Sequence, residues 1–106
     1  MKSLLLLAAL FLISFKINAV STTSDNKIKQ VHFWEGVPGV LIIHADMSKT
    51  EGCTRTDQYI LREAHPFFKE LYSLLLSAHI SGQHVRLGLK NCDSSFPSIV
   101  NIYSNK

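Results

Sequence analysis

The chain has 106 residues, of which 46% are hydrophobic, and it carries 11 lysines and arginines against 8 aspartates and glutamates. It is too short for two ordinary domains, and too apolar and weakly charged to be disordered throughout. One small globular domain is therefore expected, and no strong chemical signature in it names an activity.

The N-terminal segment has the pattern of a secretory signal peptide. A short basic start, Met1-Lys2-Ser3, precedes a nearly unbroken apolar run of 12 residues at 4–15. A helix needs roughly 20 residues to cross a bilayer core, so this run is too short to span one. We expect residues 1–19 to be removed by cleavage after Ala19, which predicts a secreted or periplasmic protein. The alternative is a buried or membrane-anchoring N-terminal helix.

The mature chain, residues 20–106, is expected to be almost neutral. Without Lys2 and Lys16, 9 basic residues remain against 8 acidic ones, a net charge of about +1. Because it has neither a basic cluster nor aromatic residues interleaved with basic ones, nucleic-acid binding is not expected. No membrane span is expected in this part either.

A β-hairpin is the first element expected in the mature chain. Residues 20–26 are polar and without period, so they are predicted to form a flexible leader, with ordered structure from Lys27 onwards. Residues 28–34 and 40–45 are rich in β-branched and aromatic side chains, and residues 35–39 between them include two glycines and a proline. A turn centred near Val37 or Pro38 would put Val31, Phe33, Leu41 and Ile43 on the core face.

One helix and three further strands are expected after the hairpin. A polar loop at 46–56 leads to a strand at 58–62, and Pro66 then suits the first turn of a helix. Apolar residues recur at spacings of three and four as far as Ala78, and Gly82 is suited to end the helix. Alternation at 84–90 predicts a strand, residues 91–95 a turn, and residues 97–103 the last strand.

The resulting order is β-β-β-α-β-β, which is mainly β with one helix. This is the order of a small OB-fold-like barrel, in which the helix closes one end of a bent sheet, and we assign that fold to residues 27–106. An open antiparallel α+β sheet with one packed helix has the same order and remains the alternative.

Cys53 and Cys92 are the two cysteines of the chain. In an exported protein an isolated pair is most simply one disulfide, which would brace a domain with a small core. A redox pair is disfavoured, because the two residues do not form a Cys-x-x-Cys motif.

Residues 68–87 resemble the helix-to-strand passage of the small OB-fold B subunits of AB5 toxins, of the subtilase-cytotoxin and typhoid-toxin kind. The matching positions are Phe68, Leu71, Gly82-Gln83, Val85 and Arg86. Small secreted bacterial proteins with the same element order and a cysteine pair resemble the chain equally well. The resemblance implies a secreted, non-enzymatic domain that forms rings and recognises glycans. No position matches the sugar-contacting residues of the toxins, so none is carried over.

The outward face of the predicted hairpin is the candidate partner surface. It combines apolar, aromatic and imidazole side chains, namely His32, Trp34, Ile42 and His44. Tryptophan is a frequent anchor at interfaces, so this face would bind a protein or glycan ligand if it is exposed. The alternative is that the helix or an adjoining loop covers it.

Enzymatic chemistry has weaker support in the sequence. His32 and His44 could hold a metal if Asp46 or Glu35 supplied a third ligand, which is the basis of a metal-dependent or hydrolytic alternative. There is no Gly-x-Ser-x-Gly elbow and no phosphate-binding glycine loop. We therefore expect a binding module without catalytic residues, metal or cofactor. A structural subunit of a homo-oligomer is the third alternative.

Overall fold

The computed structural model describes residues 20–104, so the predicted signal peptide lies outside the described residues. The described chain is mainly β, with one helix, as the sequence predicts. The elements are β1 (Ser21–Thr22), β2 (Ile28–His32), β3 (Gly39–His44), β4 (Tyr59–Arg62), α2 (Phe68–Ser81), β5 (Arg86–Asp93) and β6 (Phe96–Tyr103). No helix among these residues is long and apolar enough to cross a membrane.

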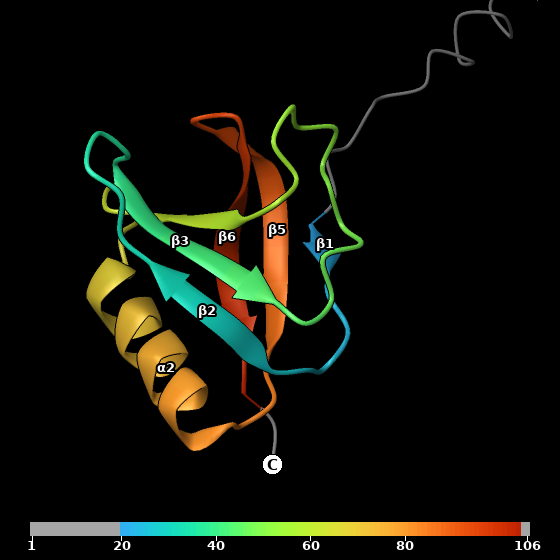
Figure 1. The fold of residues 1–106 in the computed structure, drawn as a ribbon, viewed down its shortest axis with the longest axis vertical. Helices are drawn as coiled ribbons and strands as arrows, with labels where there is room; N and C mark the ends of the chain where they lie inside the picture. Colours follow the sequence, from blue (N-terminus) through green and yellow to red (C-terminus); the bar gives the residue numbers. More distant parts are fainter. Residues whose placement is uncertain (1–19, 105–106) are drawn as a thin grey trace, which may run out of the picture.

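The strands form a single mixed sheet in the order β1-β5-β6-β4-β3-β2. All neighbours are antiparallel except β4 and β6, which run parallel, so the open antiparallel alternative is wrong on this point. The sheet is strongly bent, and Figure 1 shows β2 and β3 crossing in front of β5 and β6. Within residues 20–104 it does not close into a barrel. A single bridge outside the strands, between Asn26 and Val85, connects the chain before β2 with the chain before β5.

The segment predicted to be a flexible leader is partly built into the sheet. Ser21 and Thr22 pair with Leu89 and Gly88 of β5. Thr23 is buried, its N–H donates to the carbonyl of Leu87, and its hydroxyl accepts the Leu87 N–H, both at 3.0 Å. The expectation that order begins near Lys27 is wrong, because the free edge of β5 supplies partners that a polar sequence does not reveal.

Helix α2 covers one side of the bent sheet (Figure 1). Its buried residues Leu75 and Ala78 belong to the apolar spacing seen in the sequence. Gly82 ends the helix in the left-handed conformation, with φ 73°, and its N–H donates to the carbonyl of Ala78. Both features confirm the prediction for this element.

The interior consists of two apolar clusters. The larger one lies between the helix and the inner face of the sheet, and its largest members include Tyr59, Leu75, Leu87 and Ile99. The smaller one is formed by Leu41, Ile60 and Phe96. Because Leu41 and Ile42 belong to different clusters, β3 is buried on both of its faces. Because the second cluster buries the Leu41 face of the hairpin as well, it determines which hairpin side chains remain exposed.

Candidate binding surface

The register of the hairpin divides the predicted surface between two faces. Val31 pairs with Ile42, and His32 pairs with Leu41. The pairing is one residue out of phase with the predicted turn, so His32 shares a face with Leu41 and not with Ile42. Ile42 and His44 are 0% and 1% exposed, and Phe33, which was expected in the core, is 62% exposed. The prediction that Ile42 and His44 share one exposed surface with His32 and Trp34 is therefore wrong.

His44 is a structural residue of the interior. Its Nδ1 accepts the N–H of Asp46 at 3.0 Å, so its Nε2 carries the proton and donates to the carbonyl of Val85 at 2.8 Å. Both ring nitrogens thus have backbone partners, and His32 lies on the other face of the hairpin. The two histidines cannot share a metal ion. The described residues also contain no group of three or more His, Cys, Asp or Glu side chains that could hold one.

A different cluster surrounds the exposed ring of Trp34, and we call it the Trp34 surface. It brings together two residues from the hairpin and three from the loop that precedes β4, namely His32, Trp34, Arg55, Asp57 and Gln58. Trp34 is 51% exposed, and its ring stacks on the imidazole of His32 with 6.2 Å between centroids. The guanidinium of Arg55 lies 5.9 Å from the Trp34 centroid.

Hydrogen bonds fix the polar members of the Trp34 surface. Arg55 Nη2 donates to Asp57 Oδ2 at 2.9 Å, and Gln58 Nε2 lies 3.0 Å from His32 Nδ1. The bond from Arg55 holds the pKa of the Asp57 carboxyl below its usual value. Asp57 is therefore ionised at neutral pH and acts only as an acceptor, while Arg55 acts only as a donor.

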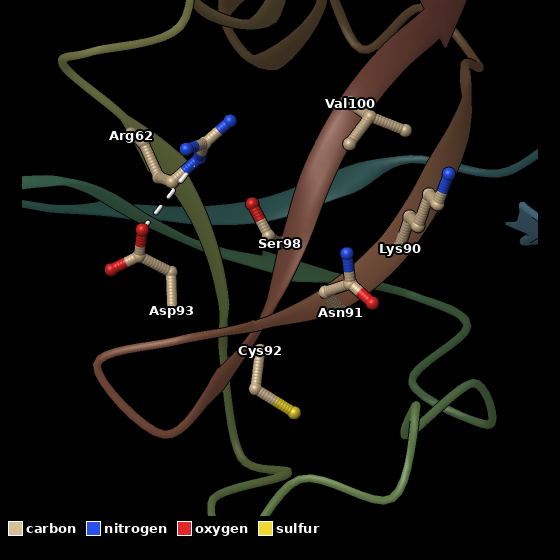
Figure 2. A pocket seen from close by; sticks show the side chains of 7 residues that line it. All are labelled: Arg62, Lys90, Asn91, Cys92, Asp93, Ser98 and Val100. Carbon is tan, nitrogen blue, oxygen red and sulfur yellow. Dashed lines mark ion pairs between the residues drawn. The ribbon is translucent and has the colours of Figure 1, made fainter. Parts of the chain in front are cut away.

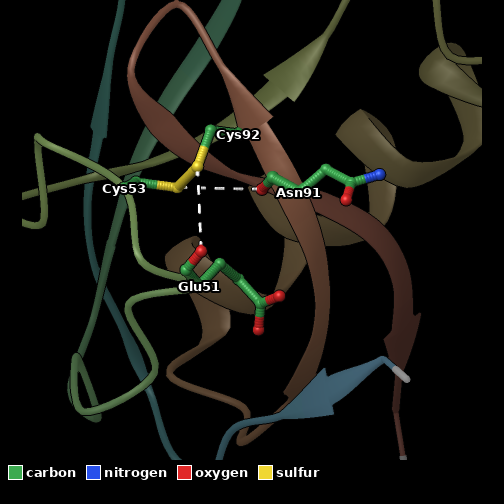
Figure 3. The surroundings of a disulfide bond; sticks show 4 residues. All are labelled: Glu51, Cys53, Asn91 and Cys92. Carbon is green, nitrogen blue, oxygen red and sulfur yellow. Dashed lines mark hydrogen bonds between the residues drawn. A yellow bond between two sulfur atoms is a disulfide. The ribbon is translucent and has the colours of Figure 1, made fainter. Parts of the chain in front are cut away.

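The loop that carries Arg55, Asp57 and Gln58 is tied down at several points. The disulfide between Cys53 and Cys92 joins it to β5 with 5.7 Å between the Cα atoms, as the sequence predicts (Figure 3). The N–H of Arg55 donates to the carbonyl of Ser95 at 2.9 Å, in the turn between β5 and β6. The buried hydroxyl of Tyr59 donates to the carbonyl of Lys49 at 2.8 Å. These links hold the Trp34 surface in place before any ligand arrives.

The surroundings of the disulfide show how closely the loop before β4 packs against β5. The two sulfurs lie 3.8 and 3.9 Å from the carbonyl oxygens of Asn91 and Glu51, respectively (Figure 3). A disulfide sulfur has no proton to donate, so these are packing contacts. Glu51 and Asn91 both have positive φ, at 53° and 62°. The chain turns sharply on each side of the bond, which brings the loop against the bulged end of β5.

The sequence pattern indicated His32 and Trp34 but not Arg55, Asp57 and Gln58. The available signal was Arg55-x-Asp57, two opposite charges two positions apart that begin two residues after Cys53. What the sequence does not show is that the disulfide brings this pair beside the hairpin.

The Trp34 surface offers one flat apolar ring surrounded by hydrogen-bonding groups of both kinds. Such an arrangement can stack on an apolar ligand face while donating and accepting hydrogen bonds at its edges. Comparison with known proteins gives no match to a family model, and no significant match to a curated protein or to a solved structure.

Proposed function

We propose that this protein is a secreted, non-enzymatic binding module that recognises a glycan through the Trp34 surface. The observation that carries the proposal is the half-exposed ring of Trp34, held beside an Arg55–Asp57 pair on a braced loop. A protein ligand is the alternative occupant.

A sugar ring has the chemistry that this surface would complement. One side of a pyranose presents several C–H groups, which pack on the face of an aromatic ring. Its neighbouring hydroxyls both donate and accept hydrogen bonds, so they suit Asp57 as an acceptor and Arg55 as a donor. The amide of Gln58 adds one group of each kind. Because the loop is already fixed, less conformational entropy is lost on binding.

Export is supported by the disulfide, since such bonds persist mainly in oxidising compartments. We further propose that the domain is an OB-fold variant similar to the B subunits of AB5 toxins. The order β2-β3-β4-β6-β5 with its one parallel pair and the Asn26–Val85 bridge supports this assignment, because closing the remaining gap would complete a five-stranded barrel. Ring formation by several copies belongs to the same proposal.

The test is a glycan array probed with the full chain after export through its own N-terminal segment. We expect selective binding to a subset of glycans and at least a tenfold loss of affinity in Trp34→Ala, about 1.4 kcal/mol. Phe67→Ala is the matched control, because Phe67 is 61% exposed but stands beside His65, before the helix. It should bind like the wild type. Absence of binding to every glycan, or equal losses in the two variants, would overturn the glycan proposal.

A further inference from the structure

A bulge in β5 opens a hollow on the face of the sheet that carries Phe96. The pairing with β6 passes from Leu89–Ile99 to Cys92–Pro97, so Lys90 and Asn91 both face Ser98. Asn91 has φ 62°, which lets the strand bend outward there. The hollow has a volume of about 200 Å³, and β4 contributes Arg62 to its wall. Figure 2 shows Arg62 and Asp93 on one side of Ser98, with Lys90 and Asn91 on the other.

Two polar atoms at this hollow have no hydrogen-bond partner within the described part of the chain. Ser98 is only 4% exposed, and its hydroxyl is unpaired. The Nε of Arg62 is also buried and unpaired, and Asp93 Oδ2 lies 3.6 Å from it, beyond hydrogen-bond distance. Buried polar groups in folded proteins nearly always have a hydrogen-bond partner. Two such atoms without a partner at the same hollow therefore point to a ligand that would bond both.

The charges around the hollow select the kind of ligand. Arg62 and Lys90 are cationic and Asp93 is anionic, which leaves a net charge of +1 at the wall. Arg62 and Lys90 can only donate hydrogen bonds, and Ser98 and the amide of Asn91 can donate as well. Asp93 compensates part of the charge of Arg62 as an ion pair at 3.6 Å, but at that distance it does not accept a hydrogen bond from Nε.

We propose that this hollow binds a single small oxyanion, of the carboxylate, sulfate or phosphate type. Ser98 and Arg62 donate to it from the floor and one wall, and Lys90 supplies the second positive charge from the opposite wall. The volume suits one such group together with water. This site is separate from the Trp34 surface, and its occupation does not depend on glycan recognition.

The experiment is an NMR titration of the amide signals of the full exported chain with sodium phosphate, sodium sulfate and sodium acetate. Sodium chloride at the same ionic strength serves as the reference. We expect saturable shifts confined to residues 90–93, 98 and their neighbours. A response to acetate identifies a carboxylate site, and a response only to phosphate or sulfate identifies a site for tetrahedral anions. Shifts that follow ionic strength alone in all three titrations would overturn the proposal.

Variants separate binding from folding. Lys90→Gln should weaken binding at least about fivefold, since it removes a charge-assisted contact, whereas Lys69→Gln removes an exposed lysine of α2 and should have no effect. Ser98→Ala should weaken binding without changing the charge. Asp93→Asn should strengthen binding, because it removes the competing carboxylate, and an unfolded variant cannot produce this gain. Equal affinities in Lys90→Gln and Lys69→Gln, or no gain in Asp93→Asn, would overturn the assignment.

Discussion

The guanidinium of Arg55 lies over the ring of Phe96, with Cζ 4.7 Å from the ring centroid. Phe96 is 2% exposed and belongs to the smaller apolar cluster. The same guanidinium reaches towards Trp34 and bonds Asp57. One side chain therefore covers a piece of the interior and also forms part of the proposed binding surface, so the stability of this region and its ability to bind are linked.

Replacement of Arg55 by Ala should lower both properties. Loss of the cation–π contact and of the cover over Phe96 is expected to reduce the free energy of unfolding by about 1 kcal/mol, measured by urea denaturation. Glycan affinity should fall in the same variant. Arg86→Ala is the matched control, since the guanidinium of Arg86 lies over a different ring, 5.8 Å from the centroid of Tyr103. It should keep full affinity, and an equal loss of affinity in both variants would contradict the linkage.

Removal of the disulfide should have a larger effect on stability. The bond joins residues 39 positions apart, and closing a loop of this length stabilises a fold by about 4 kcal/mol in the chain-entropy model. The double variant Cys53→Ala/Cys92→Ala should lose that amount in chemical denaturation, and the wild type in reductant should behave in the same way. Mass spectrometry with an alkylating agent checks the oxidation state beforehand. A double variant as stable as the oxidised wild type would contradict the bracing role.

The sequence predicted the helix and the five longer strands because their patterns are local. The spacing of apolar residues before Gly82 specifies one buried helix face, and alternation around Leu87 specifies a half-buried strand. Strand β1 was missed because two polar residues carry no period and are held only by the edge of β5. The disulfide was predictable because the chain has only two cysteines and the pattern of an exported protein.

The faces of the hairpin could not be predicted from the same kind of pattern. Val40, Leu41, Ile42 and Ile43 are all apolar, so this strand has no alternation from which the inward face could be deduced. The side chain of Leu41 is buried by Ile60 and Phe96, which come from distant parts of the chain. The position of Arg55 beside Trp34 likewise depends on contacts between loops. The three residues of the Trp34 surface that the sequence pattern did not indicate are therefore those whose position depends on tertiary structure.

Gly39 is required by the close approach of β3 to β4. A Cβ atom added there would clash with the carbonyl oxygen and carbon of Leu61, which belong to the backbone and cannot rotate away. Gly39→Ala should therefore lower the free energy of unfolding by about 3 kcal/mol. Gly36→Ala is the control, because its Cβ would meet no atom within 4 Å and only the φ of 88° is unfavourable. It should cost about 1 kcal/mol, and equal losses in thermal or urea unfolding would contradict the steric explanation.

Asp46 should make the stability of the fold depend on acid. Its Oδ2 accepts the N–H of Ser24 at 2.7 Å and its Oδ1 accepts the N–H of Ser48 at 3.0 Å. These bonds, that of Ser24 first, hold the pKa of the carboxyl well below its usual range. Because the pKa is lower in the folded than in the unfolded chain, the carboxylate stabilises the fold above the unfolded value of about 3.9. That contribution is lost as the pH falls from there through the folded pKa.

Asp46→Asn should accordingly unfold at lower urea concentration than the wild type at pH 7, and the difference between the two should shrink progressively below pH 4. Asp25→Asn is the matched control, since Asp25 is an exposed aspartate in the same segment as Ser24. Its unfolding midpoint should follow that of the wild type at every pH. If Asp46→Asn and the wild type differed by the same amount at pH 7 and at pH 2, the stabilisation would not come from the ionised carboxylate. The link between Ser24 and the loop after β3 would then depend on the shape of the side chain and not on its charge.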